Sequence, residues 1–126
     1  MNEFSAAIGR IQLKKLQKLN NIRKKIAKRY SEELKIEDKM EFSKDCAYHL
    51  FWIRVRSRDK LRKILLKNKI ETGIHYAPVH KFELYNKKLK LNITEKVSSE
   101  IITIPMHPNL TEKEVDKVIR CINNYS

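Results

Sequence analysis

The sequence predicts an α+β domain in which a three-stranded sheet carries its helices on one face, with a long helix at the N-terminus. Apolar residues recur every three or four positions through residues 3–34, which is the period of an amphipathic helix. Three later segments are rich in β-branched or alternating apolar residues, and helical patterns separate them. With 126 residues and 41% hydrophobic content, the chain is large enough for one packed core and too short for two.

The first predicted element is a single helix over residues 3–34, a stretch without proline. At 1.5 Å per residue such a helix is about 48 Å long, whereas a compact domain of this size is only about 30 Å across. One end of the helix is therefore expected to pack on something that this chain lacks. Its apolar stripe comprises Phe4, Ile8, Ile11, Leu16, Leu19, Ile22, Ile26, Tyr30 and Leu34.

The rest of the chain alternates strands and helices. Strands are expected within residues 47–56, over 70–76 and over 101–104, where Pro105 ends the last one. Helices are expected over 58–68, which Ser57 can cap, and over 94–100. The last helix begins at a capping box, Thr111-Glu112-Lys113-Glu114, in which hydroxyl and carboxylate satisfy each other's backbone donors. Residues 77–92 form a long irregular segment, and such segments are often functional.

The charge balance is strongly basic, because 28 Lys and Arg against 15 acidic residues give a formal charge of +13. Such an excess attracts polyanions. Many of the cations lie on the first helix, at Arg10, Lys14, Lys15, Lys18, Arg23, Lys24, Lys25, Lys28 and Arg29. Proteins that bind single strands place aromatic side chains among such cations, and this stretch has none before Tyr30. A solvated helix face is therefore favoured over specific nucleic-acid binding.

Cysteine usage and hydropathy indicate the compartment. Cys46 and Cys121 are too few for a disulfide scaffold and lack metal-ligand spacing, so reduced thiols are expected. No apolar run approaches the roughly 18 residues of a membrane span, and the amphipathic start lacks the apolar block of a signal peptide. These features predict a cytoplasmic protein without a membrane partner.

The richest polar cluster lies where the second predicted strand runs into the irregular segment. His75, Tyr76 and His80 surround Pro78 there, and such groups donate to phosphate or hydroxyl oxygens at neutral pH. A partly buried histidine beside a locally bonded tyrosine is the commoner arrangement at such a spacing, and this alternative stays open. No metal is expected, because these two histidines and His107 lack a further ligand at suitable spacing. His49, inside an apolar run, is expected in the core.

Four segments, in this order and across nearly the whole chain, carry a further pattern: Met1–Gly9 with Gln12-Leu13, Tyr48–Phe51, Gly73–Tyr76 with Pro78–His80, and Ile104–Thr111. Together they resemble the C-terminal small domain of the DegT/DnrJ/StrS family of sugar aminotransferases, which are pyridoxal-phosphate enzymes of fold type I. The resemblance implies that the sheet is antiparallel, that residues 1–35 are an amphipathic interdomain helix, and that residues 36–126 are the α+β small domain.

The resemblance also implies a large domain, absent from this chain, that binds pyridoxal phosphate and carries the Schiff-base lysine. The chain is then a domain fragment or the product of a truncated gene, expected to hold no cofactor, to supply no catalytic residue and to be inactive alone. The complete enzyme is expected to be a homodimer that transfers an amino group from an amino acid, with glutamate the expected donor, to a keto nucleotide-sugar in polysaccharide or surface-glycan biosynthesis. By resemblance, His75, Tyr76 and His80 bind this substrate.

Two functions of other classes remain open from the sequence alone. One is a stand-alone basic module whose first helix binds nucleic acid. The other is an interaction domain that pairs with a partner through the apolar stripe of that helix.

Overall fold

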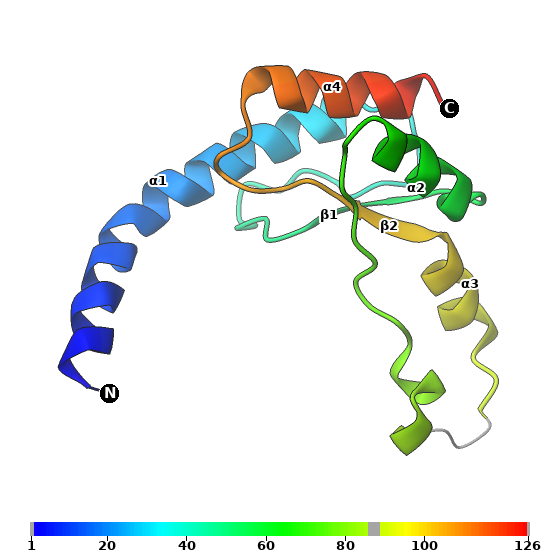
Figure 1. The fold of residues 1–126 in the computed structure, drawn as a ribbon, viewed down its shortest axis with the longest axis horizontal. Helices are drawn as coiled ribbons and strands as arrows, with labels where there is room; N and C mark the ends of the chain where they lie inside the picture. Colours follow the sequence, from blue (N-terminus) through cyan, green and yellow to red (C-terminus); the bar gives the residue numbers. More distant parts are fainter. Residues whose placement is uncertain (1, 86–88, 126) are drawn as a thin grey trace.

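The computed structural model describes residues 2–85 and 89–125, so residues 1, 86–88 and 126 lie outside the description. The predicted α+β class is confirmed, because four α-helices accompany a small antiparallel sheet (Figure 1). Met1 of the first family segment falls outside the described residues, as does the middle of the irregular segment predicted over 77–92. The division of the chain at residue 35 stays a prediction.

Helix α1 (Glu3–Glu33) is the long N-terminal helix that the sequence predicts. Asn2 caps it by accepting a hydrogen bond from the Ser5 amide at 2.8 Å. Its C-terminal half packs on the domain through buried residues such as Ala27 and Tyr30, while its N-terminal half projects away from the domain (Figure 1). Five large apolar side chains are exposed on the projecting half: Phe4, Ile8, Ile11, Leu13 and Leu16.

The sheet has two strands, β1 (Phe51–Arg54) and β2 (Ile101–Ile104), which run antiparallel. The third strand expected over residues 70–76 is wrong. That segment makes one isolated bridge, in which Gly73 and Thr103 exchange backbone hydrogen bonds of 3.0 and 2.9 Å. In this register the next hydrogen-bonded pair would join Glu71 to Pro105, and Pro105 has no amide hydrogen to donate. Beyond Gly73 the segment runs away from β2 (Figure 1).

The core lies between the sheet and three helices. Strand β1 buries Phe51 and Ile53 completely, and Tyr30 of α1 meets the Phe51 ring edge-on at 5.3 Å between centroids. Helix α2 (Arg58–Lys67) adds Leu61 and Leu65 to this core. Helix α4 (Glu112–Asn123) adds Val115, Val118, Ile119 and Ile122, the four positions that its sequence period predicts. Helix α3 (Asn92–Glu100) buries no residue completely.

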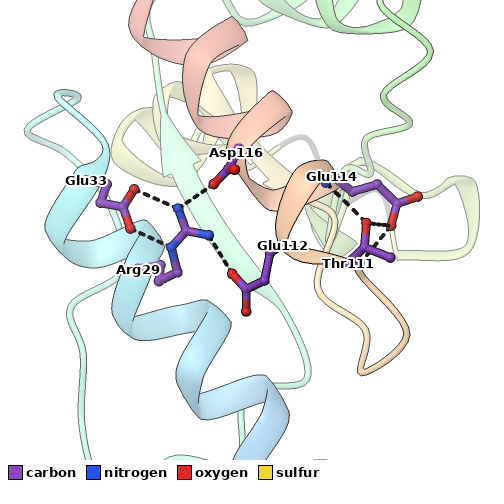
Figure 2. A network of polar contacts seen from close by, with 6 residues as sticks. All are labelled: Arg29, Glu33, Thr111, Glu112, Glu114 and Asp116. Atoms are coloured by element: carbon purple, nitrogen blue, oxygen red, sulfur yellow. Dashed lines mark hydrogen bonds and ion pairs between the residues drawn. The ribbon is translucent and has the colours of Figure 1, made fainter.

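Helices α2 and α4 begin where the sequence predicts, whereas α3 begins two residues earlier, at Asn92. Thr111 and Glu114 form the predicted capping box, since each side chain accepts a hydrogen bond from the other residue's amide, at 3.3 and 2.8 Å (Figure 2). Ser57 occupies the N-cap position of α2, but its side chain makes no capping hydrogen bond. The hydroxyl of Ser57 therefore does not fix the start of that helix.

A charged cluster around Arg29 joins α1 to α4 (Figure 2). The guanidinium binds both Glu33 oxygens, at 2.6 and 2.9 Å, and reaches Glu112 at 2.8 Å and Asp116 at 2.7 Å. These hydrogen bonds raise the pKa of Arg29 further and lower the pKa of Glu33. Near the same place, the Asn123 side chain accepts from the Lys35 amide and donates to the Glu33 carbonyl. The direction of α1 relative to the domain is thus fixed at its C-terminal end.

Candidate functional site

The candidate site begins at the single bridge between Gly73 and β2. Two residues later, His75 is held by a 2.8 Å contact between its Nδ1 atom and the Thr103 hydroxyl. A Cβ atom at position 73 would lie 2.8 Å from that Nδ1 and 2.8 Å from the hydroxyl oxygen. The absence of a side chain at Gly73 therefore lets the imidazole lie against Thr103.

His75 lines two shallow hollows. One, of about 230 Å³, is also lined by His49, Thr103 and Met106. The other, of about 360 Å³, lies between the segment Tyr76–Pro78 and helix α3. The His75 Nε2 atom has no hydrogen-bond partner among the residues that the structure describes. It is therefore the polar atom of this imidazole that is free to bind a ligand.

Tyr76 is the most exposed of the three residues singled out from the sequence. Its side chain is 72% exposed, and its ring meets the His75 ring edge-on with 4.9 Å between centroids. No hydrogen bond of its hydroxyl is present among residues 2–85 and 89–125. The locally bonded tyrosine that the sequence left open is therefore not found among the described residues.

His80 lies apart from this pair, in the short helix η1 (Val79–Lys81). Its side chain is only 10% exposed, and its Nε2 atom lies 3.3 Å from an oxygen of Glu95. The same carboxylate binds Lys81 at 2.9 Å and accepts from the Leu91 amide at 3.2 Å. Hydrogen bonds from Lys81, the Leu91 amide and His80, in that order, lower the pKa of Glu95 to about 2.

The two remaining histidines, His49 and His107, are both exposed. The expectation that His49 is a core residue is wrong: its side chain is exposed, and its neighbour Tyr48 fills the core instead. Tyr48 has a left-handed backbone conformation with φ of 53°, and the strand expected from residue 47 begins only at Phe51, so the alternation of a strand does not place His49 in the core. His107 is exposed and lines a separate hollow beside α4.

Sequence reasoning missed Glu95. Its one signal was a carboxylate in the first turn of a predicted helix, where the helix dipole favours negative charge. It also missed the dependence of His75 on Gly73, because the spacing of the two residues does not show a close approach.

The described residues show which of two ligands, a metal ion or pyridoxal phosphate, this site could hold by itself. Within residues 2–85 and 89–125, no three His, Cys, Asp or Glu side chains gather in a way that could hold a metal ion. Neither hollow beside His75 is lined by a lysine. The site as described therefore does not supply the amine that holds pyridoxal phosphate. No helix among the described residues is long and apolar enough to cross a membrane.

Comparison with known proteins identifies the family. The sequence pattern of the DegT/DnrJ/EryC1/StrS aminotransferase family matches residues 1–123. The chain belongs to this family. Its relatives are enzymes, so the resemblance seen in the four sequence segments is confirmed at the level of the family.

Relatives of known sequence or structure show how much of an aminotransferase the chain spans. The dTDP-3-amino-3,6-dideoxy-alpha-D-galactopyranose transaminase of Aneurinibacillus thermoaerophilus is 32% identical, over 99% of this chain and 36% of its own length. The aminotransferase TlmJ of Streptoalloteichus hindustanus is 26% identical, with a TM-score of 0.89 over 98% of this chain and 36% of its own. DesV of S. venezuelae, solved with a ketimine intermediate, is 27% identical, with a TM-score of 0.88 over 99% and 36%. This chain therefore spans about a third of the length of these relatives.

Proposed function

We propose that this chain is the C-terminal part of a pyridoxal-phosphate-dependent aminotransferase that transfers an amino group to a keto nucleotide-sugar. Membership of the family and the dTDP-sugar transaminase among the relatives support this substrate class. Within the proposal, glutamate is the amino donor, the complete enzyme is a cytoplasmic homodimer, and the product enters polysaccharide or surface-glycan biosynthesis. The cofactor and the lysine that holds it belong to the part of the enzyme that precedes this region in the relatives.

The observation that carries the proposal is the fixed imidazole of His75. Thr103 holds one ring nitrogen and leaves the other beside the two hollows. In this position the ring binds a hydroxyl or phosphate oxygen of the sugar nucleotide without first losing rotamer freedom, which lowers the entropy lost on binding. The exposed Tyr76 hydroxyl adds a second polar contact. His80 would reach the substrate only through Nδ1, because its Nε2 faces Glu95.

Half-reaction kinetics of the complete enzyme test this role. His75→Ala should lower kcat/KM for the keto nucleotide-sugar about tenfold to a hundredfold, the effect of losing a hydrogen bond to a charged group. The half-reaction with the amino donor should change far less, because that substrate lacks the sugar and diphosphate. His107→Ala is the matched control, since His107 is exposed and lines a hollow without His75. Equal losses in both half-reactions would show that His75 does not discriminate between the substrates.

One observation favours a second candidate, an interaction role for the first helix. The projecting half of α1 exposes Phe4, Ile8 and Ile11 along one face, and exposed apolar patches of this kind mark contact surfaces. In the complete enzyme this surface would face the preceding domain. In the chain alone, the same surface favours self-association.

A further inference from the structure

The segment between α2 and β2 has an outgoing limb, residues 76–85, that extends away from the domain, and a returning limb, residues 89–100, that leads back through α3 (Figure 1). It contains η1 and a second short helix, η2 (Glu83–Tyr85). Large apolar side chains on it are exposed, with Leu84 at 84% and Tyr85 at 54%. Burial therefore does not fix the position of this segment, and polar contacts have to do so.

Glu95 makes those polar contacts. It lies in the first turn of α3, on the returning limb, and binds His80 and Lys81 of the outgoing limb with different carboxylate oxygens. The oxygen that faces His80 also accepts from the Leu91 amide. Among the described residues, no other hydrogen bond or ion pair joins residues 76–85 to residues 89–100. One carboxylate thus holds the two limbs together.

The place of this clamp relates it to the candidate site. The hollow of about 360 Å³ has Tyr76 and Pro78 on one wall and Ile93, Thr94 and Val97 of α3 on the other. The clamp joins the two walls directly beside this hollow, because His80 follows Pro78 by two residues and Glu95 follows Thr94. The contacts of Glu95 therefore link the wall that carries Tyr76 to the wall that α3 forms.

We propose that Glu95 is a positioning residue, which through His80 and Lys81 holds Tyr76 and the adjoining loop in place for the nucleotide-sugar. The substrate part of this inference rests on the proposed function, whereas the clamp itself does not. His80 then acts mainly by holding the loop. The contact with Glu95 then explains both the low exposure of the His80 side chain and the position of the Lys81 charge.

Hydrogen exchange of the chain tests the clamp without any activity. Glu95→Ala should accelerate amide exchange across residues 78–85 about threefold to tenfold, the range expected when exposed charged contacts are lost. Exchange at Thr103 should not change, because its bridge to Gly73 is independent of Glu95. Glu83→Ala is the matched control, since no ion pair of Glu83 is present within the described residues. Unchanged exchange across 78–85 in Glu95→Ala would overturn the proposal.

A double-mutant cycle in the complete aminotransferase tests the positioning role. Glu95→Ala and His80→Ala should each raise KM for the keto nucleotide-sugar more than they lower kcat, and the double variant should be no worse than the more severe single one. Additive losses would mean that His80 contacts the substrate itself, and they would overturn the positioning role. If exchange rises in Glu95→Ala while the wild-type enzyme does not aminate nucleotide-sugars, the clamp stands and the proposed function fails.

Discussion

Replacing Gly73 with alanine should destabilise the fold and displace His75. The new Cβ atom would lie 2.8 Å from His75 Nδ1 and from Thr103 Oγ1, whereas unstrained contacts of this kind are about 3.5 Å. The backbone at Gly73 is not free to relax, because both its amide and its carbonyl pair with Thr103. Overpacking of this kind costs about 1–3 kcal/mol, and here relaxation would also break the contact between His75 and Thr103.

The chain provides its own control for this experiment, because its other glycine lies in an open setting. Gly9 is in α1 with nothing within 4 Å of its Cβ position, so Gly9→Ala should raise helix content and favour the helix by about 0.5–1 kcal/mol. Urea unfolding followed by circular dichroism measures both variants, and the chemical shifts of the His75 ring report its position. A Gly73→Ala chain with wild-type stability and an unmoved His75 signal would refute the reasoning.

Three other changes have defined outcomes. Arg29→Met leaves Glu33 beside two other carboxylates and should lower the free energy of unfolding at neutral pH by about 1 kcal/mol. The hydrogen bond with Arg29 lowers the pKa of Glu33 in the folded state below its ordinary value of 4.5. The wild type should therefore lose this stabilisation as the pH falls below 4.5. The free energy of unfolding of the variant, measured in urea, should depend less on pH in that range. Replacing both Ile11 and Leu16 with Glu should abolish self-association of the chain in sedimentation without lowering its melting temperature, because both side chains are exposed. Adding pyridoxal phosphate and borohydride should label no single lysine stoichiometrically, since no lysine lines the hollows beside His75.

The first two experiments have matched control variants, and the third has a defined contrary result. Lys28→Met removes an exposed cation whose one ion pair within the described residues is with Glu32, at 3.7 Å, and should leave the pH dependence as in the wild type. Exchanging Lys14 and Lys18 for Gln lowers the charge of α1 by the same two units as the Ile11 and Leu16 exchange but spares the apolar stripe, so self-association should persist. Loss of association in both double variants would indicate a charge effect. One fully labelled lysine after borohydride treatment would contradict the third expectation.

The elements that the sequence predicts well are those decided by local chemistry. The capping box at Thr111 and Glu114 needs only residues three positions apart, and the apolar period of α4 selects the same four side chains that the core buries. The length of α1 follows from its apolar period and from the absence of proline. These features depend on neighbours within one or two turns, so the pattern of residue types is sufficient.

The errors arise where partners distant in the sequence decide the outcome. The segment 70–76 has the alternation of a strand, but whether it pairs depends on what lies across from it, and Pro105 has no amide to offer. His49 is expected in the core because it lies in an apolar run, but the strand begins only at Phe51 and the backbone before it turns through a left-handed residue at Tyr48. At the candidate site, His75 and Tyr76 could be named from their residue types, whereas Glu95 could not, since His80 is fifteen positions away.

The bonds at the C-terminal end of α1 have a mechanical consequence for its other end. Phe4 lies 25 residues before Arg29, so it is about 38 Å along a straight helix from the cluster that fixes the helix direction. Over that distance a tilt of about 5° at the cluster moves Phe4 by about 3 Å, roughly the width of one methyl group. Substitutions at Glu112 or Asp116 on α4 would therefore misalign the far tip of α1 more than they disturb their own surroundings. The position of the N-terminal end of α1, and thus its contact with any partner, therefore depends on how exactly the Arg29 cluster fixes the tilt of the helix.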